Sequence, residues 1–283
     1  MKTRSRFVVV DGIRTHYLEA GEGRPVVLLH AGEFGGGAQL SWEQTIPALA
    51  ERYRVIAPDW LGFGETDKLH DFTGGQSRRL WHMTRFLEVL AVGDAAFVGN
   101  SMGGTLLAKV AAAEHPEWPI TALVLASGGG FVPFNQARRQ LVDYDGSAEG
   151  MRDIVRTVFY DERFARDDAY VQRRHRASLA PGAWEAAAAA RLKPPTAPER
   201  DDVFGQPDTT PYELIDVPTL LVAGADDRLR EPGYADELHK RIRGSRLSVF
   251  SSCGHLPQLE HPAQFNDLVT AFLSEVYPAR DEQ

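Results

Sequence analysis

The sequence predicts an α/β fold, in which a mostly parallel sheet carries helices on both faces. Short apolar stretches alternate with amphipathic ones along the chain, which is typical of strand–helix–strand units. Residues 99–103 read G-x-S-x-G and lie between an apolar stretch and a helical pattern. Two later apolar stretches are followed by an aspartate pair and by a histidine, at points where loops of such sheets present functional groups.

The expected elements begin with a hairpin of residues 7–10 and 13–18, because Asp11-Gly12 between them is a tight-turn signal. Further strands are expected at residues 25–29, 53–57, 95–98, 120–126, 219–223 and 247–250. Helices are expected at residues 41–52, with Ser41 as the N-cap, at 76–90 and at 103–114.

The alternation stops between residues 127 and 211. This segment is rich in Arg, Asp and Ala, has helical periodicity at 151–160 and 167–178, and ends in a proline-rich stretch. We therefore expect one core domain formed by residues 1–126 and 212–283. Residues 127–211 are expected to form an inserted helical cap, or lid.

The composition is that of a globular protein with a small-molecule substrate. The chain has 283 residues, of which 43% are hydrophobic and 25% charged. Its net charge of −8 argues against nucleic acid or an anionic membrane surface as the partner, since either favours a basic face. Association into a homo-oligomer is left open by the sequence.

The cysteine and histidine content predicts neither a disulfide nor a metal site. Cys253 is the single cysteine, which we take as typical of a cytoplasmic protein. His255 and His261 have no carboxylate at metal-ligand spacing, and no cofactor is expected. No signal peptide is expected, and no apolar stretch approaches the roughly 18 residues of a membrane span.

Ser101, at the centre of the G-x-S-x-G motif, is the candidate nucleophile. In such an elbow the chain turns sharply from strand to helix, so Gly99 and Gly103 are needed where a Cβ has no room. The turn holds the serine hydroxyl clear of the sheet at a helix N-terminus. This geometry predicts nucleophilic catalysis.

A nucleophilic serine needs a base and a carboxylate that orients the base. His255 is the candidate base. Asp226 and Asp227 compete as the acid, and we favour Asp227, which lies three residues after Gly224. The chain order of serine, aspartate and histidine is that of a hydrolase triad on an α/β sheet.

The oxyanion hole is expected to combine the backbone amides of Met102 and Gly32. Gly32 belongs to the loop at residues 30–37, which holds four glycines directly after a buried strand. Glu33 lies beside it, where a negative charge would oppose an oxyanion unless the side chain is paired, protonated or turned away. A Glu33 that faces solvent is the alternative. The loop at residues 59–64 is expected to brace the elbow.

These motifs carry a resemblance to a known family. They lie at residues 30–37, 59–67, 99–104, 224–228 and 250–255. Over nearly its whole length the chain resembles the α/β-hydrolases, and among them the meta-cleavage product hydrolases. Those serine enzymes split carbon–carbon bonds in vinylogous diketones from the degradation of aromatic compounds. The family's spacing between acid and histidine also selects Asp227.

The resemblance further implies a substrate-binding role for Asn100 and Arg174, at positions that hold the dienol and carboxylate end of the substrate in the family. Arg174 is assigned from the likeness of residues 174–178 to a cap-helix motif of the family. Arg173 and Arg176 compete for this role, and a run of arginines on a helix is also typical of a solvated face.

The chain departs from the family at three places. Ala31 and the pair Glu33-Phe34 interrupt a loop that is usually small and glycine-rich, and Leu256 stands where an aromatic residue often follows the histidine. We expect Glu33, Phe34 and Leu256 to contact the substrate, so that the enzyme accepts a different substrate from those of the family.

Hydrolysis of a carbon–carbon bond is the leading hypothesis, with His255 activating Ser101 or a water. Ester or lactone hydrolysis is the alternative, followed by a lyase or cyclase and by a ligand-binding protein that keeps the fold as a pocket. Dehalogenase or epoxide hydrolase chemistry is not expected, because its members resemble one another in having an aspartate at the position of Ser101.

Overall fold

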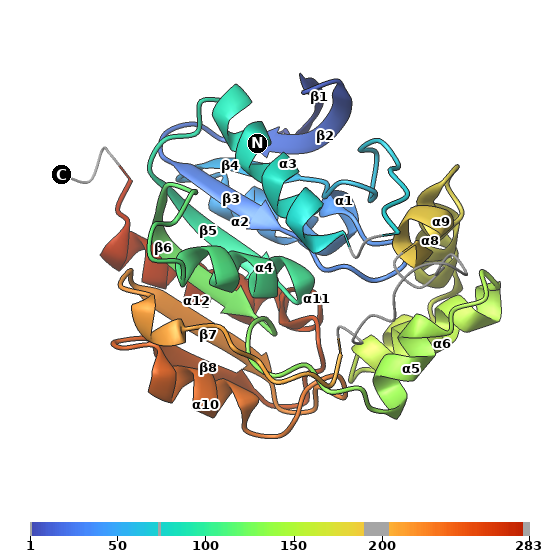
Figure 1. The fold of residues 1–283 in the computed structure, drawn as a ribbon. Helices are drawn as coiled ribbons and strands as arrows, with labels where there is room; N and C mark the ends of the chain where they lie inside the picture. The colour runs from blue at the N-terminus through green and yellow to red at the C-terminus, as the bar shows by residue number, and fades with distance from the viewer. Residues whose placement is uncertain (1, 73–74, 190–203, 280–283) are drawn as a thin grey trace.

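The computed structural model describes residues 2–72, 75–189 and 204–279, which build one sheet between two layers of helices (Figure 1). The sheet has eight strands in the order β1-β2-β4-β3-β5-β6-β7-β8. Its strands are β1 (Arg4–Val10), β2 (Ile13–Ala20), β3 (Pro25–Leu29), β4 (Arg54–Pro58), β5 (Ala95–Asn100), β6 (Ile120–Ala126), β7 (Thr219–Gly224) and β8 (Arg246–Phe250). The pairs from β4 through β8 are parallel, and β1 and β2 run antiparallel to their neighbours. The predicted fold class is confirmed.

The predicted strands are all present. The six that follow the hairpin agree with the expected ranges to within two residues. In the hairpin, Asp11 and Gly12 both have positive φ angles, 48° and 86°, as a two-residue turn between twisted antiparallel strands requires.

The helices are α1 (Ala38–Trp42), α2 (Thr45–Leu49), α3 (Gln76–Val89), α4 (Met102–Ala111), α5 (Gln136–Val142), α6 (Ala148–Val158), α7 (Arg163–Arg166), α8 (Asp168–Ser178), α9 (Ala183–Ala188), α10 (Tyr234–Arg241), α11 (Pro257–Glu260) and α12 (Pro262–Val276). A short 3₁₀ turn, Tyr212–Leu214, precedes β7. Among the described residues, none of these helices is long and apolar enough to cross a membrane.

The helix expected at residues 41–52 was wrong in its start, its length and its cap. Two short helices, α1 and α2, occupy this region, and Ser41 is buried inside α1. Pro47 lies in the first turn of α2, where a missing N–H is tolerated, whereas one continuous helix would place it in the interior. The Oδ1 atom of Asp59, 21 residues away, accepts the Ala38 amide at 2.7 Å and so supports the start of α1.

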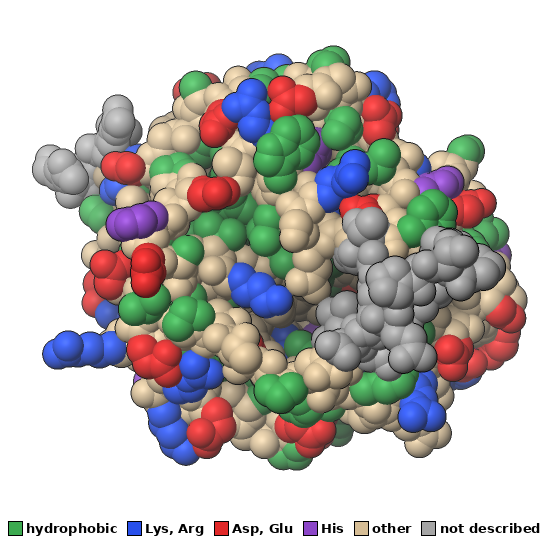
Figure 2. Space-filling view, viewed as in Figure 1, with side chains coloured by type: hydrophobic (Ala, Val, Ile, Leu, Met, Phe, Trp, Pro, Cys, Tyr) green, Lys and Arg blue, Asp and Glu red, His purple; other side chains and the backbone are tan. Residues whose placement is uncertain are grey.

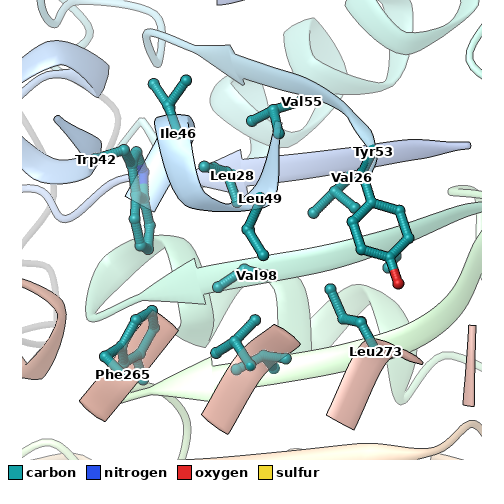
Figure 3. Packing of buried hydrophobic residues seen from close by; sticks show 14 of the residues in the cluster. Val26, Leu28, Trp42, Ile46, Leu49, Tyr53, Val55, Val98, Phe265 and Leu273 are labelled. Carbon is teal, nitrogen blue, oxygen red and sulfur yellow. The ribbon is translucent and has the colours of Figure 1, made fainter. Parts of the chain in front are cut away.

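Two apolar clusters hold the layers together. On one face, Trp42 and Ile46 from α1 and α2 and Phe265 from α12 pack around strand residues such as Leu28 and Val98 (Figure 3). On the other face, α3, α4 and α10 cover the sheet. These layers fix the carboxyl ends of the parallel strands, after which Ser101, Asp227 and His255 lie.

Helices α5 to α9 lie between β6 and β7 in the chain and gather at one side of the sheet (Figure 1). They form a third apolar cluster that includes Phe34, Leu229 and Leu256 from the loops after β3, β7 and β8. Residues 190–203, which hold part of the expected proline-rich stretch, lie outside the described residues.

Figure 2 shows acidic, basic and apolar side chains interspersed over one face of the molecule. In the described part of the chain, no group of three or more His, Cys, Asp or Glu side chains is arranged to hold a metal ion.

Candidate active site

Ser101 lies at the tip of a sharp turn between β5 and α4. Its backbone has φ 52° and ψ −115°, an uncommon conformation for a residue with a side chain. The Ser101 amide donates to the carbonyl of Ala126 at 2.9 Å, and its own carbonyl accepts from the Thr105 amide at 2.8 Å. The strand on one side and the helix on the other therefore hold the strained turn in place.

The two glycines of the motif are required by close packing. A Cβ on Gly99 would lie 2.7 Å from the backbone of Gly104, and one on Gly103 would lie 2.3 Å from the carbonyl oxygen of Leu29. No real Cβ atom comes this close to backbone, so larger residues would displace the elbow from β3. The reason inferred from the sequence is thereby confirmed.

The structure brings Ser101, His255 and Asp227 into one hydrogen-bonded chain. His255 Nε2 lies 2.6 Å from Ser101 Oγ, and His255 Nδ1 lies 2.6 Å from Asp227 Oδ2. The histidine and the aspartate are both buried, whereas the competing Asp226 is exposed. Of the two candidate acids, Asp227 is the one that forms a hydrogen bond with the histidine.

Asp227 is held in its ionised form. Burial alone would raise the pKa of its carboxyl group, but the attraction and hydrogen bond of His255 and the charge of Arg230 outweigh burial, so the pKa lies below its usual value. The second oxygen, Oδ1, accepts the Leu229 amide at 2.9 Å. The carboxylate can therefore orient His255 and stabilise an imidazolium cation.

The loop after β3 packs directly against the residue that follows Ser101. A Cβ on Gly32 would lie 2.5 Å from Met102 Sδ, so the two expected oxyanion donors belong to touching segments. Met102 is the first residue of α4, and its amide has no acceptor within the helix. The role of both amides as oxyanion donors stays a prediction.

The loop at residues 59–64 braces the loop after β3. The Trp60 amide donates to His30 Nε2 at 3.0 Å, and the indole N–H of Trp60 donates to the His30 carbonyl at 3.0 Å. Burial lowers the pKa of His30, so the ring is neutral and its Nε2 can accept. Asp59, the residue before Trp60, forms a 2.6 Å hydrogen bond with His16, a partner that the sequence analysis missed.

Asn100 ties the elbow to the histidine loop. Its side-chain amide donates to the carbonyls of Ala126 and His255 at 3.0 and 3.3 Å, and its Oδ1 accepts from Gln258 at 3.2 Å. Asn100 is fully buried, so its observed contacts are with protein, and a direct contact with substrate stays a prediction. Gln258 was missed because its partner is 158 residues away.

Arg174 is buried, whereas Arg173 and Arg176 are exposed, so α8 turns one arginine inward. Its Nη2 donates to Glu33 Oε1 at 2.7 Å, and its Nη1 donates to Tyr170 Oη at 3.2 Å. The solvent-facing alternative for Glu33 is wrong, because the side chain is only 6% exposed. The resemblance assigns the Arg174 guanidinium to a substrate carboxylate, but this group is already paired with the carboxylate of Glu33.

Phe34 and Leu256 lie in the apolar cluster beneath α5 to α9. Both are buried, and the ring of Phe34 packs against that of Tyr144 with 4.9 Å between centroids. They therefore join the loops after β3 and β8 to helices α5 to α9. Their contact with substrate stays a prediction.

Comparison with known proteins places the chain in a family. Residues 25–262 match the family model described as the alpha/beta hydrolase fold. A 2-hydroxy-6-oxo-6-(2'-aminophenyl)hexa-2,4-dienoic acid hydrolase of Metapseudomonas resinovorans is 34% identical over 95% of this chain and 90% of that protein. A 2-hydroxymuconate semialdehyde hydrolase of Pseudomonas sp. strain CF600 is 32% identical over 95% and 94%.

Among solved structures, a meta-cleavage product hydrolase from Pseudomonas fluorescens IP01 superposes with a TM-score of 0.83. It is 30% identical and covers 95% of this chain and 97% of its own. The family model and these relatives agree with the observed fold. The chain is therefore a hydrolase that belongs to the α/β-hydrolase fold family and, within it, to the meta-cleavage product hydrolases.

Proposed function

We propose that this hydrolase cleaves a carbon–carbon bond in a small vinylogous diketone of the meta-cleavage type. Ser101, His255 and Asp227 are the catalytic triad in this proposal. The observation that carries it is the hydrogen-bonded chain from Ser101 through His255 to Asp227. Its substrate class is supported by relatives that are named as hydrolases of 2-hydroxy-6-oxo-dienoates.

His255 serves as the general base and then as the general acid. Its Nε2 takes a proton from Ser101 or from a water that adds to the ketone, while Asp227 stabilises the imidazolium. The dienol first ketonises by moving its hydroxyl proton to carbon. The electron pair of the breaking bond can then delocalise into the remaining unsaturated ketone, and the leaving carbon departs as an enolate.

The tetrahedral oxyanion is stabilised by the amides of Met102 and Gly32. On the serine route, bond cleavage leaves an acyl group on Ser101, which water releases as a carboxylic acid. On the water route, the acid forms directly. In both, one water supplies the hydroxyl group of the acid and the hydrogen of the dienol product.

The inserted segment of residues 127–211, whose described part holds helices α5 to α9, acts as the lid over this site, on a core of residues 1–126 and 212–283. Support comes from the apolar cluster in which Phe34 and Leu256 meet α5 to α9. A lid that covers the triad excludes water and strengthens the electrostatic interactions beneath it. Asn100, Arg174 and Glu33 complete the proposed substrate-binding set.

The test is turnover of 2-hydroxy-6-oxo-6-phenylhexa-2,4-dienoate, followed by the loss of its visible absorbance. Ser101→Ala and His255→Ala, with unchanged circular dichroism, should each reduce turnover at least about a thousandfold. Bleaching by the wild type but not by the variants would support the proposal. Equal bleaching by folded variants would refute the triad, and no bleaching by the folded wild type would refute the substrate class.

Ester or lactone hydrolysis is the second candidate. It is favoured by one observation, the Glu33 carboxylate on Arg174, which leaves no uncompensated positive charge in this pair. The same triad and oxyanion donors serve either reaction. Serine-dependent release of 4-nitrophenol from 4-nitrophenyl butyrate, without bleaching of the dienoate, would select this candidate.

A further inference from the structure

Glu33 and Arg174 form a buried ion pair between the loop after β3 and helix α8. The side chains are 6% and 1% exposed, and Arg174 Nη2 lies 2.7 Å from Glu33 Oε1. Both groups are charged: burial alone would raise the pKa of Glu33, but the attraction and hydrogen bond of Arg174 are the main opposing effects, and with a backbone hydrogen bond they leave the pKa below its usual value. The pair as a whole is therefore electrically neutral.

This pair lies beside the proposed oxyanion hole. Glu33 follows Gly32 directly, so their Cα atoms are about 3.8 Å apart, and Gly32 packs against Met102. Helix α8 also contacts the same loop, because a Cβ on Gly35 would lie 2.4 Å from the Arg174 carbonyl oxygen. The charges on these two side chains therefore act on any group bound between α8 and the loop after β3.

A lone arginine here would attract a substrate carboxylate, but the pair does not. A second carboxylate brought to Arg174 would lie close to Glu33 in surroundings of low polarity, where repulsion between like charges is strong. Arg174 Nε is buried and has no acceptor within the described residues. A neutral carbonyl or hydroxyl oxygen could accept from this N–H without adding charge.

We propose that Glu33 is a specificity-determining residue. Glu33 neutralises Arg174. The site therefore binds a substrate with an uncharged oxygen group near α8 more tightly than the same substrate with a free carboxylate there. This inference deepens the proposed function and rests on it for the place of the substrate.

The test measures affinity separately from chemistry. In Ser101→Ala protein, dissociation constants of 2-hydroxy-6-oxo-6-phenylhexa-2,4-dienoate and of its methyl ester are obtained by absorbance titration. Glu33→Gln in this background should tighten binding of the free acid at least tenfold and change binding of the ester less than threefold. Glu33→Asp keeps the charge and should keep the wild-type preference for the ester.

Glu43→Gln is the matched control. Glu43 pairs with Arg173, the exposed neighbour of Arg174 on α8, and the substitution changes the net charge of the protein equally. It should leave the ratio of acid to ester affinity unchanged. Equal shifts for acid and ester in Glu33→Gln, or the same shift in Glu43→Gln, would overturn the proposal.

A second pair of probes separates this inference from the proposed function. If the dienoates neither bind nor react, kcat/KM of wild type and Glu33→Gln is compared for 4-nitrophenyl butyrate and for mono-4-nitrophenyl succinate, which carries a carboxylate. A selective gain of about tenfold for the succinate would support the role of Glu33 even though the proposed substrate was wrong. No selective gain, or no reaction with either ester, would overturn it.

Discussion

The backbone amide of His255 donates a 2.8 Å hydrogen bond to the carbonyl oxygen of Val158, the last residue of α6. The loop that carries His255 is thus bonded to α6 as well as to the sheet. Glu260 strengthens this connection, because one carboxylate oxygen accepts from the Gly254 amide at 2.6 Å. The other oxygen accepts from the amides of Tyr160 and Asp161 at 2.8 and 3.0 Å.

Glu260→Gln should impair both stability and catalysis. The carboxamide replaces one acceptor oxygen by an NH₂ group that faces backbone N–H donors, so at least one buried donor loses its partner. We expect a loss of about 1–3 kcal/mol in the free energy of unfolding, measured by urea denaturation. If Glu260 positions His255, kcat should fall about tenfold or more while KM changes little.

Glu275→Gln provides the control, since Glu275 forms an exposed ion pair with Arg246 and the substitution removes the same charge. It should leave stability and kcat close to wild type. A Glu260→Gln protein with unchanged kcat would show that Glu260 only supports the fold.

The sequence predicted the features that depend on local pattern. Each strand of the parallel sheet is a short apolar stretch, and the elbow at Ser101 depends on residues within the same turn. Side-chain contacts between distant segments could not be predicted in this way. Glu33 and Arg174 are 141 residues apart, so only the folded chain shows that each neutralises the other.

The same distinction explains the error at residues 41–52. Apolar periodicity predicted one helix, but its start depends on Asp59, which caps α1 from another strand end. The sequence pattern favoured Asp227 over Asp226 only through its spacing after Gly224 and through the family resemblance. The folded chain adds the physical reason, because Asp227 is buried against His255 whereas Asp226 is exposed.

Asp227→Asn should reduce kcat about ten-thousandfold, as expected when the orienting carboxylate of a triad becomes an amide. Asparagine is nearly isosteric, but it cannot stabilise the imidazolium and can favour the wrong tautomer of His255. The measurement is steady-state turnover by protein whose circular dichroism matches wild type. Asp226→Asn removes the neighbouring, exposed carboxylate and should retain most activity; a reversed order would mean that Asp226 is the triad acid.

Gly103→Ala should destabilise the protein by at least about 2 kcal/mol, because the added Cβ would meet the Leu29 carbonyl at 2.3 Å and force backbone to shift. Thermal denaturation and soluble yield measure this effect. Gly93→Ala is the matched control, since a Cβ there meets nothing within 4 Å and its φ angle is not positive. Equal stability of the two variants would contradict the close packing of the elbow against β3.

His82 should make the protein less stable as the pH falls below 6.5. It is fully buried on α3, its Nε2 lies 2.9 Å from Thr15 Oγ1, and its Nδ1 is buried without an acceptor among the described residues. Burial lowers its pKa to about 4, more than the charge of Asp11 can offset. The folded state therefore holds a neutral ring that the unfolded state protonates more readily.

The sign follows from this lowered pKa. The contribution of His82 to stability is complete above the ordinary histidine pKa of about 6.5 and is lost as the pH falls toward 4, with about 2 kcal/mol lost by pH 5.

His82→Gln keeps a polar partner for Thr15 but cannot titrate. Urea denaturation at pH 7.5 and 5.0 should show a loss about 2 kcal/mol smaller in this variant than in wild type. His115→Gln removes an exposed histidine and should keep the wild-type loss. Equal losses in His82→Gln and wild type would show that the ring is not held neutral by the fold.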